Sequence, residues 1–318
     1  MRYICLYIFC LLSLIGCSPS EEEQERLNQA SVKKELQEDS LALKVAVMPT
    51  LDCLPLYVAS DRGMFRAEGV DVRLRCFTSQ MDQDTALQKC RVEGIVSDLV
   101  RTEYLKQQGL SLRYVTSTNQ YWLLFTNRTA RIKRLNQLED KMVAMSRYSA
   151  TAMLADYAVD SVRLNSEHVF RIQINDVFIR LNMLENSIMD ALFLSEPQAT
   201  SARLMKSPIL LDSRQTDMRM GVLAFNEKLV ADTMRQRQLD GFVKAYNIAC
   251  DSINQYGYVG YADIIEKYCH TTRSVVDSLP RDHHYNRIEQ PREKDIVKAQ
   301  QWLRKELANK DRQYHGTN

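Results

Sequence analysis

The sequence predicts an α/β fold with two lobes, each a mainly parallel sheet flanked by helices, joined by two crossing segments. Apolar strand-like runs alternate with helix-like runs in two series, the first beginning at Lys44 and the second at Met142. Such an alternation is typical of parallel strands covered by helices. Apolar runs near Tyr121 to Thr126 and Gly221 to Asn226 separate the series, and we expect them to carry the chain between the lobes.

The first series contains a short strand, KVAVMP, followed by a helical run that ends near Phe65. Its expected elements, in order, are a strand at Lys44 to Met48, a helix at Leu54 to Phe65, a strand at Val70 to Phe77, a helix at Asp84 to Val92, the strand-like GIVSDL, a helix at Arg101 to Gln108 and a strand at Leu112 to Ser117. Residues 42–121 therefore begin the first lobe.

The second series repeats the pattern over residues 122–224, which we assign to the second lobe. Its expected elements are a strand at Met142 to Ser146, a helix at Ala150 to Val162, a strand at Val169 to Ile174, a helix at Val177 to Asn186, the run MDALFL, a short helix after Pro197 and a strand at Ile209 to Leu211. From Gln238 onward, apolar residues at i, i+3 and i+4 indicate helices with one buried face. Residues 225–318 are expected to pack back onto the first lobe.

The amino terminus reads as an export signal over residues 1–16, with one early positive charge and an apolar run from Ile4 to Ile15 that is too short to span a bilayer. Leu14-Ile15-Gly16-Cys17 resembles the bacterial lipobox, which predicts lipid on Cys17; the alternative is an ordinary signal with a chance cysteine. Residues 17–41 hold few large apolar side chains and are expected to form a flexible tether. The acidic Glu21 to Glu23 are either solvated charge or an export signal.

Composition narrows the function classes. The 318 residues include 42 basic and 40 acidic side chains, a balance that argues against a nucleic-acid surface. Five cysteines remain if the signal is removed and Cys17 is lipidated, namely Cys53, Cys76, Cys90, Cys250 and Cys269. Their number is odd, their pairing is open, and no spacing among them suits zinc, so no metal site is expected. His283 and His284 are expected in a solvated loop.

Three stretches carry a family resemblance. PLYVASDRGMFRAEGVDVRL, which begins at Pro55, resembles the opening of the type II periplasmic solute-binding proteins that capture thiamine pyrimidine precursors, sulfonates, nitrate and taurine. Glu93 to Asp98 and Met189 to Thr200 resemble two further elements of that family, so the likeness extends over residues 43–225. In the opening stretch the matching positions are Pro55, Leu56, Tyr57, Ala59, Gly63, Phe65, Gly69, Val70 and Val72.

The resemblance implies a lipid-anchored monomer in the cell envelope, most naturally at the periplasmic face, with the cell surface as the alternative. It would capture a small polar organic molecule, such as a thiamine-precursor pyrimidine, and deliver it to the permease and ATPase of an ABC importer. Two other readings stay open: an enzyme of pyrimidine or menaquinone biosynthesis on the same fold, and a surface receptor without transport. No common catalytic or nucleotide-binding motif is present, so neither catalysis nor a cofactor is expected.

Ligands of such sheets bind at the carboxyl ends of the strands, and hinge closure between the lobes is expected to enclose them. Each expected contact has a structural alternative: Asp52 and Ser149 are also good helix caps, Glu196 suits a role within its lobe, and aromatic side chains near the first crossing suit packing. Arg147, beside a helix start, is the expected anion contact. The expected ligand contacts are Asp52, Cys53, Ser79, Asp98, Asn119, Trp122, Arg147, Tyr148, Ser149, Thr151, Asp176 and Glu196.

Overall fold

The computed structural model describes residues 21–282 and 284–315. The chain divides into two compact units, one ending at Ala42 and one beginning at Leu43. In the first unit, Glu21–Leu41 forms one helix, α2, where the sequence predicted a flexible tether. Its Glu, Gln, Lys and Leu residues favour helix locally without needing a core. Whether this helix acts as a tether stays a prediction, and Cys17 and the signal lie outside the described residues.

The unit that begins at Leu43 contains two five-stranded sheets, which confirms the two-lobed α/β fold. The strands of the first sheet, in pairing order, are β2 (Val72–Cys76), β1 (Leu43–Val47), β3 (Gly94–Asp98), β10 (Gly221–Asn226) and β4 (Leu112–Ser117). Those of the second are β7 (Val169–Gln173), β6 (Lys141–Met145), β8 (Ala191–Leu194), β5 (Leu123–Thr126) and β9 (Ile209–Asp212). The two orders correspond position by position.

Each sheet contains one strand that runs against the others. In the first sheet β10 is antiparallel to β3 and β4, and in the second β5 is antiparallel to β8 and β9. Both are the strands by which the chain enters a sheet from the other lobe. A chain that leaves one sheet at the carboxyl edge enters the facing sheet at that same edge, so it must run in the opposite direction.

This arrangement corrects the expected crossing points. The run at 121–126 was expected to pass between lobes, but β5 lies within the second sheet, and β10 lies within the first. The chain crosses in the segments just before these strands, at 118–122 and 213–220, which we call the first and second crossing segments. The first lobe therefore regains the chain at Gly221, four residues before the expected boundary at 225.

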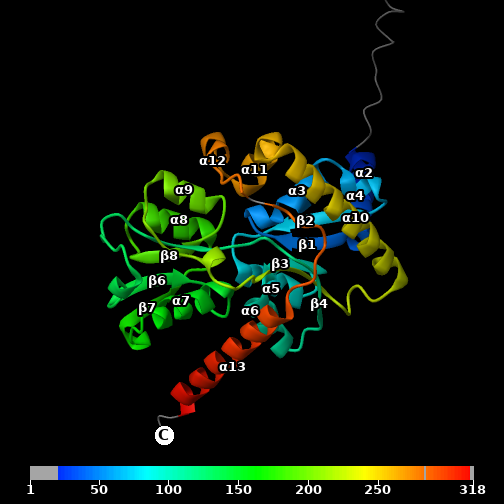
Figure 1. The fold of residues 1–318 in the computed structure, drawn as a ribbon. Helices are drawn as coiled ribbons and strands as arrows, with labels where there is room; N and C mark the ends of the chain where they lie inside the picture. Colours follow the sequence, from blue (N-terminus) through cyan, green and yellow to red (C-terminus); the bar gives the residue numbers. More distant parts are fainter. Residues whose placement is uncertain (1–20, 283, 316–318) are drawn as a thin grey trace, which may run out of the picture. The chain divides into compact units, whose positions relative to one another are not determined.

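Helices cover both faces of each sheet (Figure 1). In the first lobe these are α3 (Leu54–Asp61), α4 (Met64–Ala67), α5 (Gln80–Gln88) and α6 (Leu99–Gln107), and in the second α7 (Ala150–Ser161), α8 (Val177–Glu185) and α9 (Gln198–Leu204). The sequence predicted one helix from Leu54 to Phe65, but Gly63 has a φ of 68° and ends α3 before α4 begins. Glycine adopts this left-handed conformation without the steric cost of a Cβ atom.

The carboxyl-terminal helices pack largely as expected. They are α10 (Thr233–Tyr256), α11 (Ala262–Cys269), α12 (Arg273–Asp277) and α13 (Glu293–His315). Helices α10 and α11 pack against α3 of the first lobe, whereas α13 contacts both lobes. Gln300 of α13 donates to Glu103 of α6 (2.9 Å), and the Trp302 indole N–H donates to Asp156 of α7 (2.8 Å). The last helix thus connects the lobes a third time.

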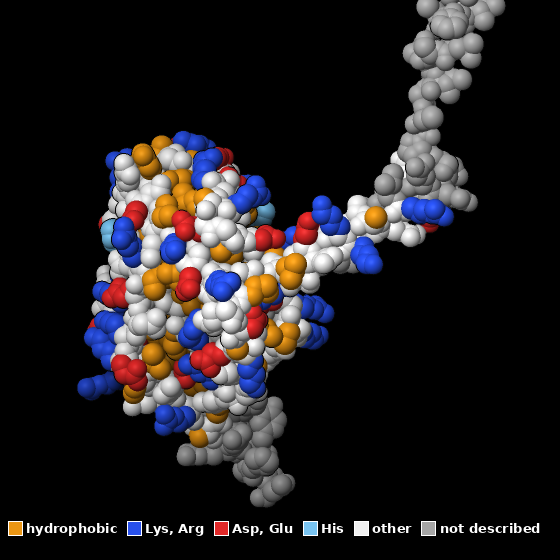
Figure 2. Space-filling model, turned by 90° about the vertical axis from the view of Figure 1, so that its right-hand side faces the viewer, with side chains coloured by type: hydrophobic (Ala, Val, Ile, Leu, Met, Phe, Trp, Pro, Cys, Tyr) orange, Lys and Arg blue, Asp and Glu red, His pale blue; other side chains and the backbone are white. Residues whose placement is uncertain are grey.

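The surface carries charges of both signs, and the described cysteines form no disulfide. On the face in Figure 2, basic and acidic side chains are intermixed. Cys53, Cys76, Cys90, Cys250 and Cys269 are free thiols, and Cys53, Cys250 and Cys269 are buried. Within residues 21–282 and 284–315 there is no cluster of three potential metal ligands among His, Cys, Asp and Glu, and no helix is both long and apolar enough to cross a membrane.

Candidate functional site

The carboxyl edges of the two sheets face each other and touch along an interface that we call the interlobe seam. Three pairs of strand ends form it: those of β1 and β8, of β2 and β7, and of β3 and β6. At the first pair Gln198 donates to the Pro49 carbonyl (2.8 Å) and the Leu51 N–H donates to the Glu196 carbonyl (2.9 Å). The seam thus brings strand-end residues of both lobes into direct contact, at the edges where the sequence predicted a ligand cleft.

Asp98 lies at the third pair and is completely buried. Its carboxylate accepts from the Arg101 N–H (2.9 Å), which caps α6, and from the Ala150 N–H at the start of α7 (3.0 Å). Gln80 also donates to it (2.9 Å). Burial raises the pKa of this carboxyl, while these hydrogen bonds favour its charged form. One side chain therefore caps a helix in each lobe.

The loop after β6 is a capping loop. Ser149 accepts from the Thr151 N–H (3.2 Å) and is the N-cap of α7, and the Thr151 hydroxyl accepts from the Ser146 N–H (2.9 Å). Tyr148 is buried with its ring 4.5 Å from that of Tyr104. Arg147 contributes its carbonyl to the seam, accepting from Arg101 (2.8 Å), while its side chain is exposed. Anion binding by Arg147 stays a prediction.

The second pair of strand ends joins Asp176 to the loop after β2. Asp176 caps α8 through the Phe178 and Ile179 N–H groups (2.8 and 2.9 Å) and accepts from the Thr78 hydroxyl across the seam. Ser79 is buried and forms an isolated β-bridge with Asp176. Both predicted ligand contacts are thus engaged with the opposite lobe.

Glu196 is buried and surrounded by donors. It accepts from the Tyr121 hydroxyl (2.8 Å), from the N–H and hydroxyl of Thr200 (3.0 and 2.7 Å), and from Arg203 (2.5 Å). Burial beside this carboxylate raises the pKa of Tyr121, so the phenol stays protonated. These contacts fit the structural alternative for Glu196, a role in holding its lobe together. Trp122 fits the packing alternative, because it is buried in the second-lobe core.

Asp52 follows β1 and is buried beneath the crossing segments. Its carboxyl accepts from the hydroxyls of Thr50 (2.6 Å) and Thr118 (3.4 Å), and it caps no helix. Burial raises its pKa to about 6. Cys53 is fully buried, and burial also raises the pKa of its thiol, so it is a protonated packing residue. Thr118 connects Asp52 to the cavity described next.

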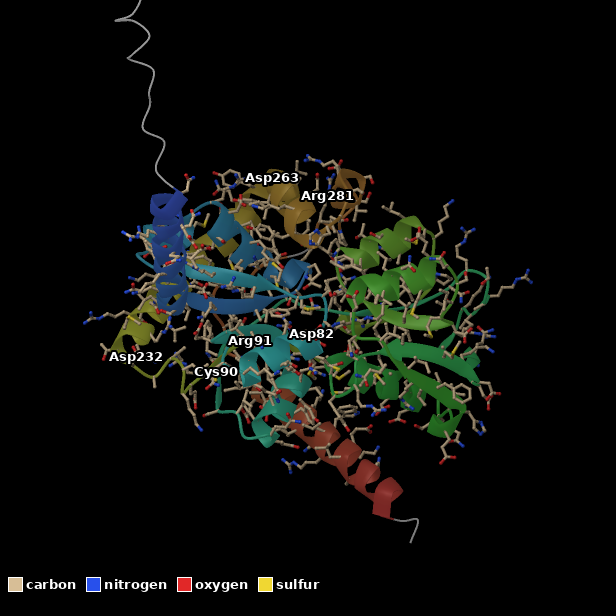
Figure 3. The ribbon with its side chains drawn as sticks, turned by 180° about the vertical axis from the view of Figure 1, so that it is seen from behind. Asp82, Cys90, Arg91, Asp232, Asp263 and Arg281 are labelled. Atoms are coloured by element: carbon tan, nitrogen blue, oxygen red, sulfur yellow. The ribbon has the colours of Figure 1, made fainter. Side chains whose placement is uncertain are left out.

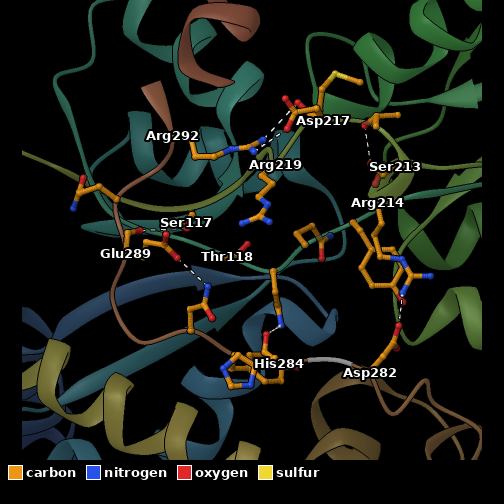
Figure 4. Close-up of a pocket in the computed structure, with 18 of the residues that line it drawn as sticks. Ser117, Thr118, Ser213, Arg214, Asp217, Arg219, Asp282, His284, Glu289 and Arg292 are labelled. Atoms are coloured by element: carbon orange, nitrogen blue, oxygen red, sulfur yellow. Dashed lines mark hydrogen bonds and ion pairs between the residues drawn. The ribbon is translucent and has the colours of Figure 1, made fainter. Parts of the chain in front are cut away.

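A cavity of about 620 Å³, which we call the hinge pocket, opens where both crossing segments meet (Figure 4). Its volume lies within the range of small-molecule sites, about 300–1,000 Å³. Both lobes contribute to it. Its lining comes from Ser117–Tyr121, Ser213–Arg219, Tyr246, and Asp282, His284, Tyr285, Asn286, Glu289, Gln290 and Arg292 of the segment that leads to α13.

Most charges in the hinge pocket are paired. Arg214 bonds Asp212 and Asp282 (2.7 and 3.2 Å) and lies over the Tyr121 ring, 4.3 Å from its centroid. Arg292 bonds Asp217 at 2.9 Å, and Lys294 and Arg292 together lower the pKa of Asp217 to about 2. These pairs hold the second crossing segment against the segment before α13.

Two unsatisfied groups in the hinge pocket bear on ligand binding. Arg219 is exposed and points into the cavity, and no described residue forms a hydrogen bond or ion pair with it (Figure 4). Asn119 donates to the His284 carbonyl (3.1 Å), but its own side-chain oxygen is buried without a donor. The pocket therefore contains a cation without a partner and a hydrogen-bond acceptor without a donor among the described residues.

Of the predicted contacts, only Asn119 lines this pocket, and Asp52 borders it through Thr118. Sequence reasoning missed Arg214, Arg219 and Arg292, and it expected His284 in a solvated loop, whereas His284 lines the hinge pocket. The available signal was the charge-rich DSRQTDMR run just before β10. The segment before α13 has no periodic pattern that would have placed it.

Comparisons with known proteins agree with this architecture. Residues 50–255 match the family model described as NMT1/THI5 like. A search of curated proteins found no match. Solved structures with the same fold include the aliphatic sulphonate-binding protein SsuA of Escherichia coli, at 14% identity and a TM-score of 0.68 over 85% of this chain and 92% of that one.

Two further neighbours carry other ligands in their descriptions. The ligand-binding component of an ABC-type import system from Staphylococcus aureus, with zinc bound, is 14% identical, with a TM-score of 0.69 over 84% of this chain and 92% of that one. The nitrate-binding protein NrtA of Synechocystis PCC 6803 is 12% identical, with a TM-score of 0.66 over 78% and 74% of the two chains. At these identities the likeness establishes the periplasmic-binding-protein fold and leaves the ligand open.

Proposed function

The chain belongs to the NMT1/THI5-like family, and we propose that it is a solute-binding protein that delivers a small polar organic molecule to an ABC importer. The family, the two-lobed fold and a pocket at the interlobe hinge support this role. In such a role the protein contacts permease and ATPase subunits and performs no chemistry on its ligand.

The observation that carries the proposal is the pair of unsatisfied groups in the hinge pocket. Arg219 suits an acidic group on the ligand, because a guanidinium forms charge-assisted, often bidentate, hydrogen bonds with oxyanions. The Asn119 oxygen suits an N–H or O–H donor. An aminopyrimidine phosphate, a precursor type for thiamine, carries both groups, so we take it as the first ligand to test.

We expect calorimetry to detect binding of an aminopyrimidine phosphate to the purified protein and an affinity at least about tenfold lower for Arg219→Gln, since a hydrogen bond to a charged group contributes about 1.5–3 kcal/mol. Arg66→Gln is the matched control, because Arg66 is exposed on α4 and does not line the pocket. The phosphate-free pyrimidine and nitrate serve as comparison ligands. Binding that Arg219→Gln leaves unchanged would remove the hinge pocket from the proposal.

We also propose that lipid on Cys17 holds the protein at the cell envelope, on the evidence of the Leu14-Ile15-Gly16-Cys17 string and the short apolar run before it. A lipid on an amino-terminal cysteine anchors a protein without a spanning helix. Cys17→Ala should abolish incorporation of labelled fatty acid and release the protein from the membrane fraction. Retention of both label and membrane association in this variant would defeat the anchor.

A further inference from the structure

The carboxyl-terminal helix α13 packs one apolar face against both lobes. Ile296, Ala299, Trp302 and Leu303 follow one another at helical spacing, and Ala299 and Leu303 are completely buried. Ala299 belongs to a hydrophobic cluster that also contains residues of α6 from the first lobe and of α7 from the second, and Ile296 and Trp302 pack against the same cluster. The two lobes and α13 therefore share one core.

The amino end of α13 is anchored at the hinge. Arg292, just before the helix, bonds Asp217 of the second crossing segment at 2.9 Å, and Lys294 in the first turn bonds the same carboxylate at 2.7 Å. Arg292 also bonds the completely buried Asp295 of α13 at 2.5 Å. Because these ion pairs join α13 to the segment along which the chain passes between the lobes, bending of that segment would displace the helix.

The two lobes hold α13 unequally. The helix packs against α6 of the first lobe more extensively than against α7 of the second (Figure 1). On the second-lobe side, the Trp302 indole N–H donates to Asp156 of α7 (2.8 Å), and Arg171 of β7 bonds the other oxygen of that carboxylate (2.6 Å). A hydrogen bond to a charged acceptor is stronger than one between neutral groups. This bond therefore fastens α13 to the second lobe.

We propose that α13 is a strap that holds the two lobes closed on each other. In the described structure three backbone N–H groups, which we call the seam amides, donate to acceptors of the opposite lobe across the interlobe seam. They are those of Leu51, Ala150 and Val177. In the proposed device α13 stays with the first lobe, and the lobes separate when the bond between Trp302 and Asp156 breaks. No ligand takes part, so the inference stands independently of the proposed function.

Amide hydrogen exchange, resolved residue by residue and measured without ligand, tests the strap. Each seam amide is the first N–H of a helix and has no acceptor within it, so it exchanges when the lobes separate. Trp302→Phe keeps a ring but removes the N–H donor. It should raise seam-amide exchange rates at least about tenfold, because losing a hydrogen bond to a charged group shifts the open-to-closed ratio by at least about that factor. Trp302→Ala, which also removes the ring, should raise them further.

Amides that are bonded within one lobe are the internal controls. The Phe77 N–H donates to the Val47 carbonyl (2.9 Å) in the first lobe, and the Ile174 N–H donates to the Met145 carbonyl (3.0 Å) in the second. Separation of the lobes leaves both bonds intact. Their exchange rates in Trp302→Phe should therefore equal those of the wild type.

Thr126→Val is the matched control variant, because it removes a buried hydrogen bond to the Ile132 carbonyl (3.0 Å) that lies wholly within the second lobe. It should not raise seam-amide exchange relative to exchange of the within-lobe amides. Unchanged seam-amide exchange in both Trp302 variants would overturn the strap. A uniform rise at seam and within-lobe amides would overturn it as well, since Trp302 would then stabilise the whole fold rather than the closed arrangement.

Discussion

Asp98→Ala should lower the free energy of unfolding by about 3–5 kcal/mol, one of the two largest effects that we expect from a single substitution in this chain. The Asp98 carboxylate is fully buried and satisfies the first-turn N–H groups of α6 and α7, which belong to different lobes. Alanine leaves both N–H groups and the Gln80 amide without their acceptor. Each buried group left unsatisfied costs about 1–3 kcal/mol.

Urea denaturation measures this effect, and two variants calibrate it. Asp98→Asn keeps one oxygen for the two backbone N–H groups but turns an amide toward Gln80, so we expect a loss of about 1–2 kcal/mol. Asp232→Ala removes an exposed cap from α10, on the part of the first lobe far from the seam (Figure 3), and should cost about 1 kcal/mol. If Asp98→Ala destabilises no more than Asp232→Ala, the carboxylate does not hold the two helix starts together.

The role of Asp98 illustrates what local pattern predicts well. Alternating strand and helix signals place GIVSD before a helix, and the carboxyl ends of parallel strands meet at one edge of a sheet. That pattern predicts Asp98, Asp176 and Glu196 at facing edges of the two sheets, and all three lie at the interlobe seam. The strand at Leu112–Ser117 was predicted at its observed bounds for the same reason.

What these side chains touch was harder to predict. A polar residue at a strand end contacts either a ligand or the strand end of the opposite lobe, and the choice depends on the distance between the lobes. Single-sequence periodicity carries no information on that distance. Asp176 and Ser79 show the consequence, because both were predicted as ligand contacts and both bond across the seam. Ligand binding by Asp176 and Ser79, and closure of the hinge, stay predictions.

Segments without regular secondary structure were the second feature that the sequence could not place. The hinge pocket is built from the two crossing segments and from residues 282–292, none of which is regular enough to show a period of 2 or 3.6. Their placement follows from ion pairs between distant parts of the chain, such as Arg214 with Asp282. Composition reveals that the charges exist, but only the fold determines which of them pair and which, like Arg219, have no partner among the described residues.

Asp52→Asn should stabilise the protein at neutral pH and lose that advantage in acid. Burial raises the pKa of the Asp52 carboxyl from 3.8 to about 6, so the folded protein holds this proton more tightly than the unfolded chain. Below about pH 4 the carboxyl is protonated in both states and its ionisation costs nothing. Between about pH 4 and pH 6 the unfolded chain releases this proton while the folded protein holds it, so the stability of the wild type falls over that range and the cost is constant above it. The difference of about two pKa units corresponds to about 3 kcal/mol above pH 6.

Asparagine carries no charge and still offers an oxygen to the Thr50 hydroxyl, so the variant avoids this cost. The unfolding free energy of Asp52→Asn minus that of the wild type should therefore increase by up to about 3 kcal/mol between about pH 4 and pH 7. Asp217→Asn provides the opposite sign, because Lys294 and Arg292 lower the pKa of Asp217 to about 2 and its charge stabilises the fold above that range. Urea denaturation across this pH range measures both variants. A flat difference for Asp52→Asn would mean that the carboxyl ionises at no cost in the folded protein, and burial would then not govern its pKa.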